Sequence, residues 1–170
     1  MKEWIKDILV AVICAVIILQ FIKPTIVKET SMQPTLYENN YIFLSKQAYL
    51  FGDPKAGDII VFHSNLKTEN GKEKLLIKRI IGLPGDKIKI SDEKVYLNDE
   101  ILEEPYTLEP YTAGWVEETE VPQGSLFVMG DNRQNSSDSR DESVGFVKID
   151  KVLGKAVFRL YPFNDIGLIK

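Results

Sequence analysis

Hydrophobic positions divide the chain into one long uninterrupted run near its start and many short runs after it. Residues 8–22 carry no charge and are apolar except for one glutamine. A helix of this length spans about 22 Å, which is shorter than a hydrocarbon core of about 30 Å. Trp4 and Lys23 suit the two membrane interfaces and extend the reach of the helix. The pattern predicts a transmembrane anchor over residues 8–22, with Pro24 ending the helix.

Two other interpretations of this run stay open, a cleaved secretory signal and a buried core helix. A cleaved signal would be followed by a small-x-small cleavage site, and no such site follows residue 22. Lysines lie on both sides of the run, so the positive-inside rule leaves the orientation nearly undecided. Cys14 is the only cysteine of the chain, which excludes an intrachain disulfide.

Short apolar and β-branched runs separated by turn residues fill the rest of the chain, residues 23–170, which form one predicted domain. No segment after residue 23 has a long helical period, so the expected fold class is mainly β with many short strands. The turn residues Asn98-Asp99 predict a hairpin. The predicted strands are Tyr41–Leu44, Asp58–His63, Leu75–Ile81, Lys87–Ile90, Val95–Leu97, Leu126–Met129 and Val152–Leu160.

Three polar stretches, residues 64–73, 103–120 and 130–143, are predicted to be surface loops. The second lies in an acidic segment, residues 92–120, which holds ten acidic residues against one basic residue. Phosphate contacts need Lys and Arg, so this segment argues against nucleic-acid binding there and is typical of a solvated acidic face. The length of 170 residues and the hydrophobic content of 44% are typical of one domain with an appendage.

The candidate chemistry begins at Ser31, the first residue of the phrase Ser-Met-Gln-Pro-Thr-Leu. Pro34 restricts the backbone in this phrase and favours a turn. A turn of this kind can hold a hydroxyl group in one direction, although an ordinary turn serine would have the same sequence.

A pair of adjacent cations, Lys78 and Arg79, interrupts the apolar run of residues 75–81. In a strand these side chains point to opposite faces, so one of them should face inward or toward a cleft. Burial lowers the pKa of a lysine well below its ordinary value of about 10.4, and a neutral amine can act as a general base. A serine beside such a lysine is a nucleophile that needs no histidine. Charges that protect an edge strand from aggregation would give the same pattern.

The loop over residues 130–143 contains a third set of candidates. Asp138 and Arg140 are placed to form an ion pair that braces the loop, and Ser136 is placed to hydrogen-bond a lysine amine. A flexible linker remains an alternative. The spacing of an EF-hand calcium loop is absent, and we expect no metal and no cofactor.

Four phrases in a fixed order are more specific than any one of them. They are Ser-Met-x-Pro-Thr at residue 31, Asp-Ile-Ile-Val-Phe at 58, Lys-Arg-Ile-Ile-Gly-Leu-Pro-Gly-Asp at 78 and Gly-Asp-Asn-Arg-x-Asn-Ser-x-Asp-Ser-Arg at 130. With this combination the chain closely resembles the bacterial type I signal peptidases (leader peptidases) of the Gram-positive type. The resemblance extends from the predicted anchor to the segment Val152–Ala156.

The resemblance implies a membrane-anchored serine endopeptidase with an antiparallel β-fold, which removes signal peptides from secretory preproteins through an acyl-enzyme. It implies a cytoplasmic tail over residues 1–7, the anchor over 8–22 and an extracytoplasmic catalytic domain over 23–170. The expected partners are preproteins with small residues before the cut and the lipid bilayer of the cell membrane. Nucleic acid is not an expected partner, and the expected state is a monomer.

The resemblance also implies a role for each matching residue. Ser31 matches the nucleophile and Lys78 the general base. The supporting residues are the lysine-orienting Ser136, the salt-bridge residues Asp138 and Arg140, and the leading acid of the loop, Asp131. Met32 and Ile77 are expected to line the substrate pockets. Glu29 occupies the position at which many Gram-negative members carry an oxyanion-hole serine, so that side-chain donor is missing here.

Three alternatives to this mechanism stay open. The chain could be another Ser/Lys processing peptidase, or an inactive membrane-anchored relative that only binds peptides. A Ser/His signal peptidase of the eukaryotic type would have to use His63, the only histidine of the chain. His63 lies fifteen residues before Lys78 in a separate phrase, where a surface residue at the end of a strand is the simpler interpretation.

Overall fold

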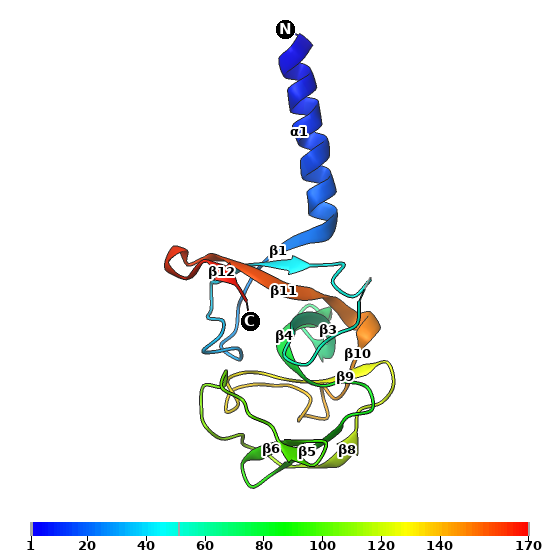
Figure 1. Ribbon diagram of the computed structural model, residues 1–170, viewed down its shortest axis with the longest axis vertical. Helices are drawn as coiled ribbons and strands as arrows, with labels where there is room; N and C mark the ends of the chain where they lie inside the picture. Colours follow the sequence, from blue (N-terminus) through cyan, green and yellow to red (C-terminus); the bar gives the residue numbers. More distant parts are fainter. Residues whose placement is uncertain (1, 51, 170) are drawn as a thin grey trace.

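A single helix projects from a β-rich domain in the computed structural model of the chain, which describes residues 2–50 and 52–169 (Figure 1). Helix α1 (Lys2–Phe21) begins before the apolar run, and strand β1 (Ile22–Ile26) follows it without an intervening residue. The helix therefore ends three residues before Pro24, which lies inside β1 and pairs with Phe43. Strand β1 is at the edge of its sheet, where a proline costs no ladder hydrogen bond.

The described apolar side chains of α1 are not packed into the domain core. Ile8, Leu9 and Val12, for example, are each more than half exposed. The alternative of a buried core helix is therefore wrong for this part of the chain. Within the residues that the structure describes, no helix combines the length and the apolar character needed to cross a bilayer.

The described strands form two antiparallel sheets, and the second sheet lies at the end of the domain far from α1 (Figure 1). The first has the order β1-β2-β11-β3-β4-β9-β10, with β12 paired to β11, and the second has the order β7-β6-β5-β8. The further strands of the first sheet are β2 (Tyr41–Ser45), β3 (Ile59–Lys67), β4 (Glu73–Gly82), β9 (Ser125–Met129), β10 (Val147–Lys148), β11 (Val152–Tyr161) and β12 (Gly167–Leu168). The second contains β5 (Lys87–Ser91), β6 (Lys94–Leu97), β7 (Glu100–Ile101) and β8 (Val116–Glu120). Short 3₁₀ turns, Ile149–Lys151 and Phe163–Asp165, flank β11.

The predicted mainly β class is confirmed, and each predicted strand is present with its ends shifted by at most a few residues. The predicted hairpin at Asn98-Asp99 is also confirmed, and both residues have positive φ values, 54° and 69°. Two predicted loops are partly wrong. Strand β3 runs on to Lys67 and β4 begins at Glu73, so only the tip of the 64–73 segment is a turn. The 103–120 segment ends in strand β8.

Strand β4 lies between β3 and β9 in the middle of the first sheet, which buries both of its faces. Lys78 pairs with Ile60 on β3, and Ile80 pairs with Val128 on β9. Ile60, Ile80 and Val128 belong to one apolar cluster, so Lys78 stands at a buried position on an apolar face. The fold therefore places a lysine where its charge has little access to water.

Candidate active site

Ser31 opens the turn that follows β1, and it is 4% exposed. Two backbone hydrogen bonds shape this turn, from Leu36 N to Met32 O at 2.7 Å and from Gln33 N to Thr30 O at 3.1 Å. The Ser31 hydroxyl is therefore held on a tightly bonded turn rather than on a free loop.

Lys78 reaches this hydroxyl from the middle of β4. Its Nζ lies 2.6 Å from Ser31 Oγ, and the side chain is 1% exposed. Burial lowers the pKa of Lys78 from 10.5 to about 8, although the carboxylates of Asp138 and Glu29 act in the opposite direction. A serine hydroxyl in contact with an amine of lowered pKa is the arrangement of a nucleophile with its general base.

Arg79, the next residue, is buried on the opposite face of β4, so both adjacent cations are inward although the sequence indicated only one. Its guanidinium donates to both carboxylate oxygens of Asp131, at 2.8 and 2.7 Å, and to Gly57 O at 2.9 Å. Thr35 Oγ1 donates to Asp131 Oδ2 at 2.5 Å. Among the residues that the structure describes, Arg79 therefore lies in a buried, two-pronged ion pair with a carboxylate, whereas the Lys78 amine hydrogen-bonds a hydroxyl.

The predicted ion pair between Asp138 and Arg140 is present, with Arg140 Nε donating to Asp138 Oδ1 at 2.8 Å. Burial alone would raise the pKa of Asp138, but Arg140, Ser136 and the Gly130 N–H hold that pKa below its ordinary value. Within residues 2–50 and 52–169, the Ser136 hydroxyl donates to Asp138 Oδ2 at 2.6 Å and does not bond Lys78. The orienting role of Ser136 toward the lysine therefore stays a prediction.

Gly130, the first residue of the 130–143 loop, packs directly against the backbone of Ser31. A Cβ atom at this position would lie 2.4 Å from Ser31 O and 2.3 Å from Ser136 Oγ, which no real contact allows. Asn132 N also donates to Ser31 O, at 3.0 Å. The loop thus fixes the position of Ser31 through the carbonyl group of that residue, and only glycine fits at this point.

The two residues expected to contact substrate lie in or against the core. Met32 is completely buried in a cluster with Val27, Leu36 and Ile42, and the partly buried Ile77 packs against the same cluster. Their role in lining substrate pockets stays a prediction.

Two other residues that the sequence singled out lie outside the Ser31–Lys78 contact. Glu29 forms an ion pair with Lys74, with 2.6 Å between Oε1 and Nζ. His63 is exposed on β3, with its Nδ1 atom 3.4 Å from Glu73. The expected surface position of His63 is therefore confirmed, but His63 lies inside β3 rather than at the end of a strand, because β3 continues to Lys67.

The site also contains three residues that the sequence did not single out, Thr35, Glu104 and Arg133. Thr35 bonds Asp131, while Arg133 bonds both Glu104 and the backbone of Gly130. The position of Arg133 within the Gly-Asp-Asn-Arg phrase was a usable signal. Glu104 gave none, because it is one of ten acids in its segment.

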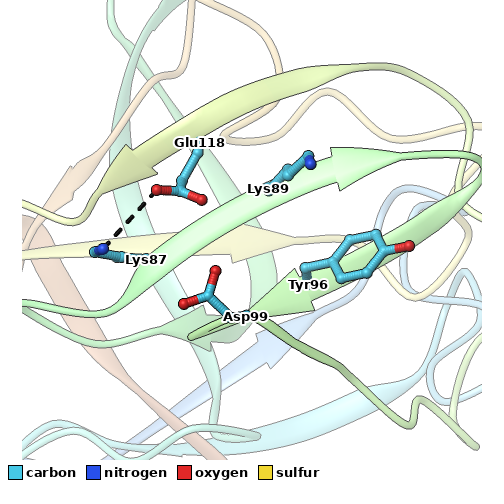
Figure 2. Close-up of a pocket in the computed structure, with 5 residues that line it drawn as sticks. All are labelled: Lys87, Lys89, Tyr96, Asp99 and Glu118. Carbon is cyan, nitrogen blue, oxygen red and sulfur yellow. Dashed lines mark ion pairs between the residues drawn. The ribbon is translucent and has the colours of Figure 1, made fainter.

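A shallow hollow on the second sheet is separate from this site. Figure 2 shows its lining residues, Lys87 and Lys89 on β5, Tyr96 on β6, Asp99 after β6 and Glu118 on β8. Lys87 and Glu118 are 3.9 Å apart, and both are about half exposed. Two cations and two carboxylates cancel, so the hollow has no net charge to attract an ionic ligand.

Comparisons with known proteins place this arrangement in a family. The family model described as signal peptidase, peptidase S26, matches residues 1–161. Signal peptidase I of Bacillus licheniformis is 37% identical over an alignment that covers 96% of this chain and 90% of the relative. A probable signal peptidase I-2 of a Synechocystis species is 40% identical, with 96% and 75% covered. A crystal structure of a signal peptidase I from Enterococcus faecalis matches with a TM-score of 0.48 at 33% identity, covering 61% of this chain and 97% of that one.

Proposed function

Since the chain belongs to the signal peptidase family, peptidase S26, and is a serine peptidase that removes signal peptides, we propose that Ser31 is its nucleophile and Lys78 its general base. The observation that carries this proposal is the distance of 2.6 Å between Ser31 Oγ and Lys78 Nζ at a buried position. A neutral amine in contact with the hydroxyl is ready to accept its proton.

The proposed reaction has two stages. Neutral Lys78 accepts the Ser31 proton while the oxygen attacks the carbonyl carbon at the end of the signal peptide. The proton then passes to the leaving amine, which becomes the new N-terminus of the mature protein, and the signal peptide remains as an ester on Ser31. Lys78 next removes a proton from water, which hydrolyses the ester and regenerates the hydroxyl.

We propose that the backbone N–H of Ser31 donates a hydrogen bond that stabilises the oxyanion. Glu29, two residues earlier, carries no hydroxyl and is engaged with Lys74. We propose that the supporting residues hold Ser31 and Lys78 in contact. Asp131 acts by pairing with Arg79, the neighbour of Lys78. Asp138, with Arg140 and Ser136, acts by holding Gly130 against Ser31. The substrate is expected to bind as an added β-strand, with Met32 and Ile77 lining the pockets that select small residues before the cut.

Helix α1 is proposed to anchor the enzyme in the cell membrane. In this arrangement the chain has a cytoplasmic tail (1–7), a transmembrane anchor (8–22) and an extracytoplasmic catalytic domain (23–170). The support is the apolar sequence of the helix and its projection from the domain (Figure 1). Its described apolar side chains are exposed. A monomer is proposed as the working state.

Extraction of membranes with alkaline carbonate tests the anchor. The full chain is expected to stay in the membrane fraction after carbonate treatment and to be released only by detergent, because an apolar helix in the bilayer is not held by charge. A variant with Val12 and Ile13 replaced by aspartate should move to the soluble fraction, since each charge near the centre of a helix opposes insertion by about 3 kcal/mol. Release of the unchanged chain by carbonate would contradict the anchor.

The pH dependence of preprotein cleavage tests the proposed base. The full chain in detergent is expected to cleave a preprotein after an Ala-x-Ala sequence, with kcat/KM rising tenfold per pH unit and levelling off above a midpoint of about 8. The constant kcat/KM rises with pH because the lysine accepts a proton only when neutral and is protonated below its pKa. His63→Ala should leave the profile unchanged. A midpoint near 6.5 would indicate a histidine base, and no cleavage at any pH would favour an inactive relative.

A further inference from the structure

Glu104 is an acid of the 92–120 segment that does not lie on a solvated face, because its side chain is only 10% exposed and pairs with Arg133. We propose that Glu104 is a positioning residue for catalysis, which holds the 130–143 loop against the backbone of Ser31 by pairing with Arg133. This inference rests on the proposed function, because it assigns a role toward the same serine.

The pair between Glu104 and Arg133 is buried and two-pronged. Arg133 Nη2 lies 2.5 Å from Glu104 Oε1, and Arg133 Nη1 lies 2.7 Å from Oε2. The Arg133 side chain is 0% exposed and the Glu104 side chain is 10% exposed. Burial alone would lower the pKa of Arg133, but the hydrogen bond and charge of Glu104 raise it above its ordinary value. The guanidinium therefore stays charged and depends on this carboxylate for its partner.

A short path of contacts connects this pair to the nucleophile. Arg133 Nε donates to Gly130 O at 2.9 Å, and the Gly130 N–H donates to Asp138 at 3.0 Å. Gly130 is thus held at both of its backbone polar groups. Because Gly130 has no room for even a Cβ atom beside Ser31 O, a displacement of Gly130 would move Ser31 as well.

Other residues of the 104–113 segment hold the same loop. Leu108 N donates to Asp131 O at 3.0 Å, and Ala113 O accepts from Arg140 at 2.7 Å. The Tyr106 ring lies 4.1 Å from the Arg79 guanidinium carbon, and the Tyr106 hydroxyl donates to Glu104 at 3.0 Å. The segment therefore contacts four charged residues around the site, Arg79, Asp131, Arg133 and Arg140. Glu104 is its only carboxylate paired with the loop among the described contacts.

The experiment compares Glu104→Gln with Glu103→Gln in the full chain, assayed in detergent with an Ala-x-Ala preprotein. Both substitutions remove one negative charge, but Glu103 is exposed. Glu104→Gln is expected to lower kcat about 10²-fold with KM changed less than threefold, because a misplaced nucleophile slows the reaction without removing substrate contacts. Glu103→Gln should leave both constants unchanged. Glu104→Asp, which keeps the charge on a shorter side chain, should recover part of the lost kcat.

A double variant separates positioning from general structural damage. If Glu104 acts through Arg133, the kcat of Glu104→Gln/Arg133→Lys should be within about threefold of the slower single variant. Far-ultraviolet circular dichroism at the assay temperature reports the folded fraction. The proposal is overturned if kcat of Glu104→Gln stays within threefold of the unchanged chain, if Glu103→Gln is equally slow, or if the lost activity equals the unfolded fraction. An inactive unchanged chain would instead contradict the proposed function itself.

Discussion

Replacing Lys78 with methionine is expected to lower kcat/KM for preprotein cleavage by about 10³-fold or more. Methionine fills nearly the same space among Ile60, Ile80 and Val128 but cannot accept a proton from the Ser31 hydroxyl. The measurement is the cleavage rate near pH 9, where the unchanged lysine is mostly neutral. Combining this change with Ser31→Ala should cost no more than either change alone, because the two groups act as one unit.

The same variant is expected to unfold less readily than the unchanged chain at neutral pH. The pKa of Lys78 is 10.5 in the unfolded chain and about 8 in the folded one. The unfolded chain thus binds more protons between these values, so stability rises with pH from about 8 to 10.5 and is lowest below 8. At pH 7 the buried lysine lowers the free energy of unfolding by about 3 kcal/mol, and replacement by methionine removes this loss.

Denaturant unfolding at pH 7 and pH 10 measures this effect, and the gain from Lys78→Met should shrink at the higher pH. Lys74→Met is the matched control on the same strand. Lys74 forms a partly exposed pair with Glu29, so its loss should change activity and stability little. Full activity of Lys78→Met would contradict the proposed base, and unfolding of this variant would contradict the expected gain in stability.

Replacing Asp131 with alanine is expected to lower the free energy of unfolding by about 3–5 kcal/mol. The change removes the carboxylate that accepts two hydrogen bonds from Arg79, whose side chain is only 3% exposed, so this buried charge loses a two-pronged partner. Total stabilities of domains are about 5–15 kcal/mol, so the variant should be partly unfolded near physiological temperature. Thermal unfolding followed by circular dichroism in detergent measures the loss.

Lys87→Met is the control for Asp131→Ala. Lys87 Nζ lies 3.9 Å from Glu118 in a half-exposed pair, and removing it should change stability by at most about 0.5 kcal/mol. Equal effects of the two substitutions would show that burial does not strengthen the dependence of Arg79 on Asp131.

The strands with β-branched and apolar residues could be predicted from sequence, and those without them could not. Strand β11 has a clear run of such residues, whereas β8, Val-Glu-Glu-Thr-Glu, resembles a charged loop. Strand β8 exists because β5 lies beside it and offers backbone partners, which is a tertiary effect. The sequence did not predict strand β1, because Pro24 indicates the end of a helix. A proline is also tolerated in a strand at the edge of a sheet, where β1 lies.

The centre of the candidate site could be predicted because its residues lie in distinctive local phrases. Ser31 stands in a proline-containing turn and Lys78 in an apolar run, so each environment can be read from its neighbours. Glu104 depends on Arg133, a partner 29 residues away, and its local sequence resembles that of any exposed acid. Met32 is adjacent to the nucleophile and buried in a core cluster, and its role in lining a substrate pocket stays a prediction.

Because Lys78 and Arg79 are adjacent on β4, their order decides which of them faces Ser31 and which faces Asp131. A chain with these two residues exchanged would have the same composition, net charge and mean hydropathy. It would nevertheless place a permanently charged guanidinium beside the Ser31 hydroxyl and a lysine opposite the Asp131 carboxylate. A one-residue slip of β4 would make the same exchange of faces. Which of the two cations faces Ser31 and which faces Asp131 is therefore decided by the alternation of side chains along the strand.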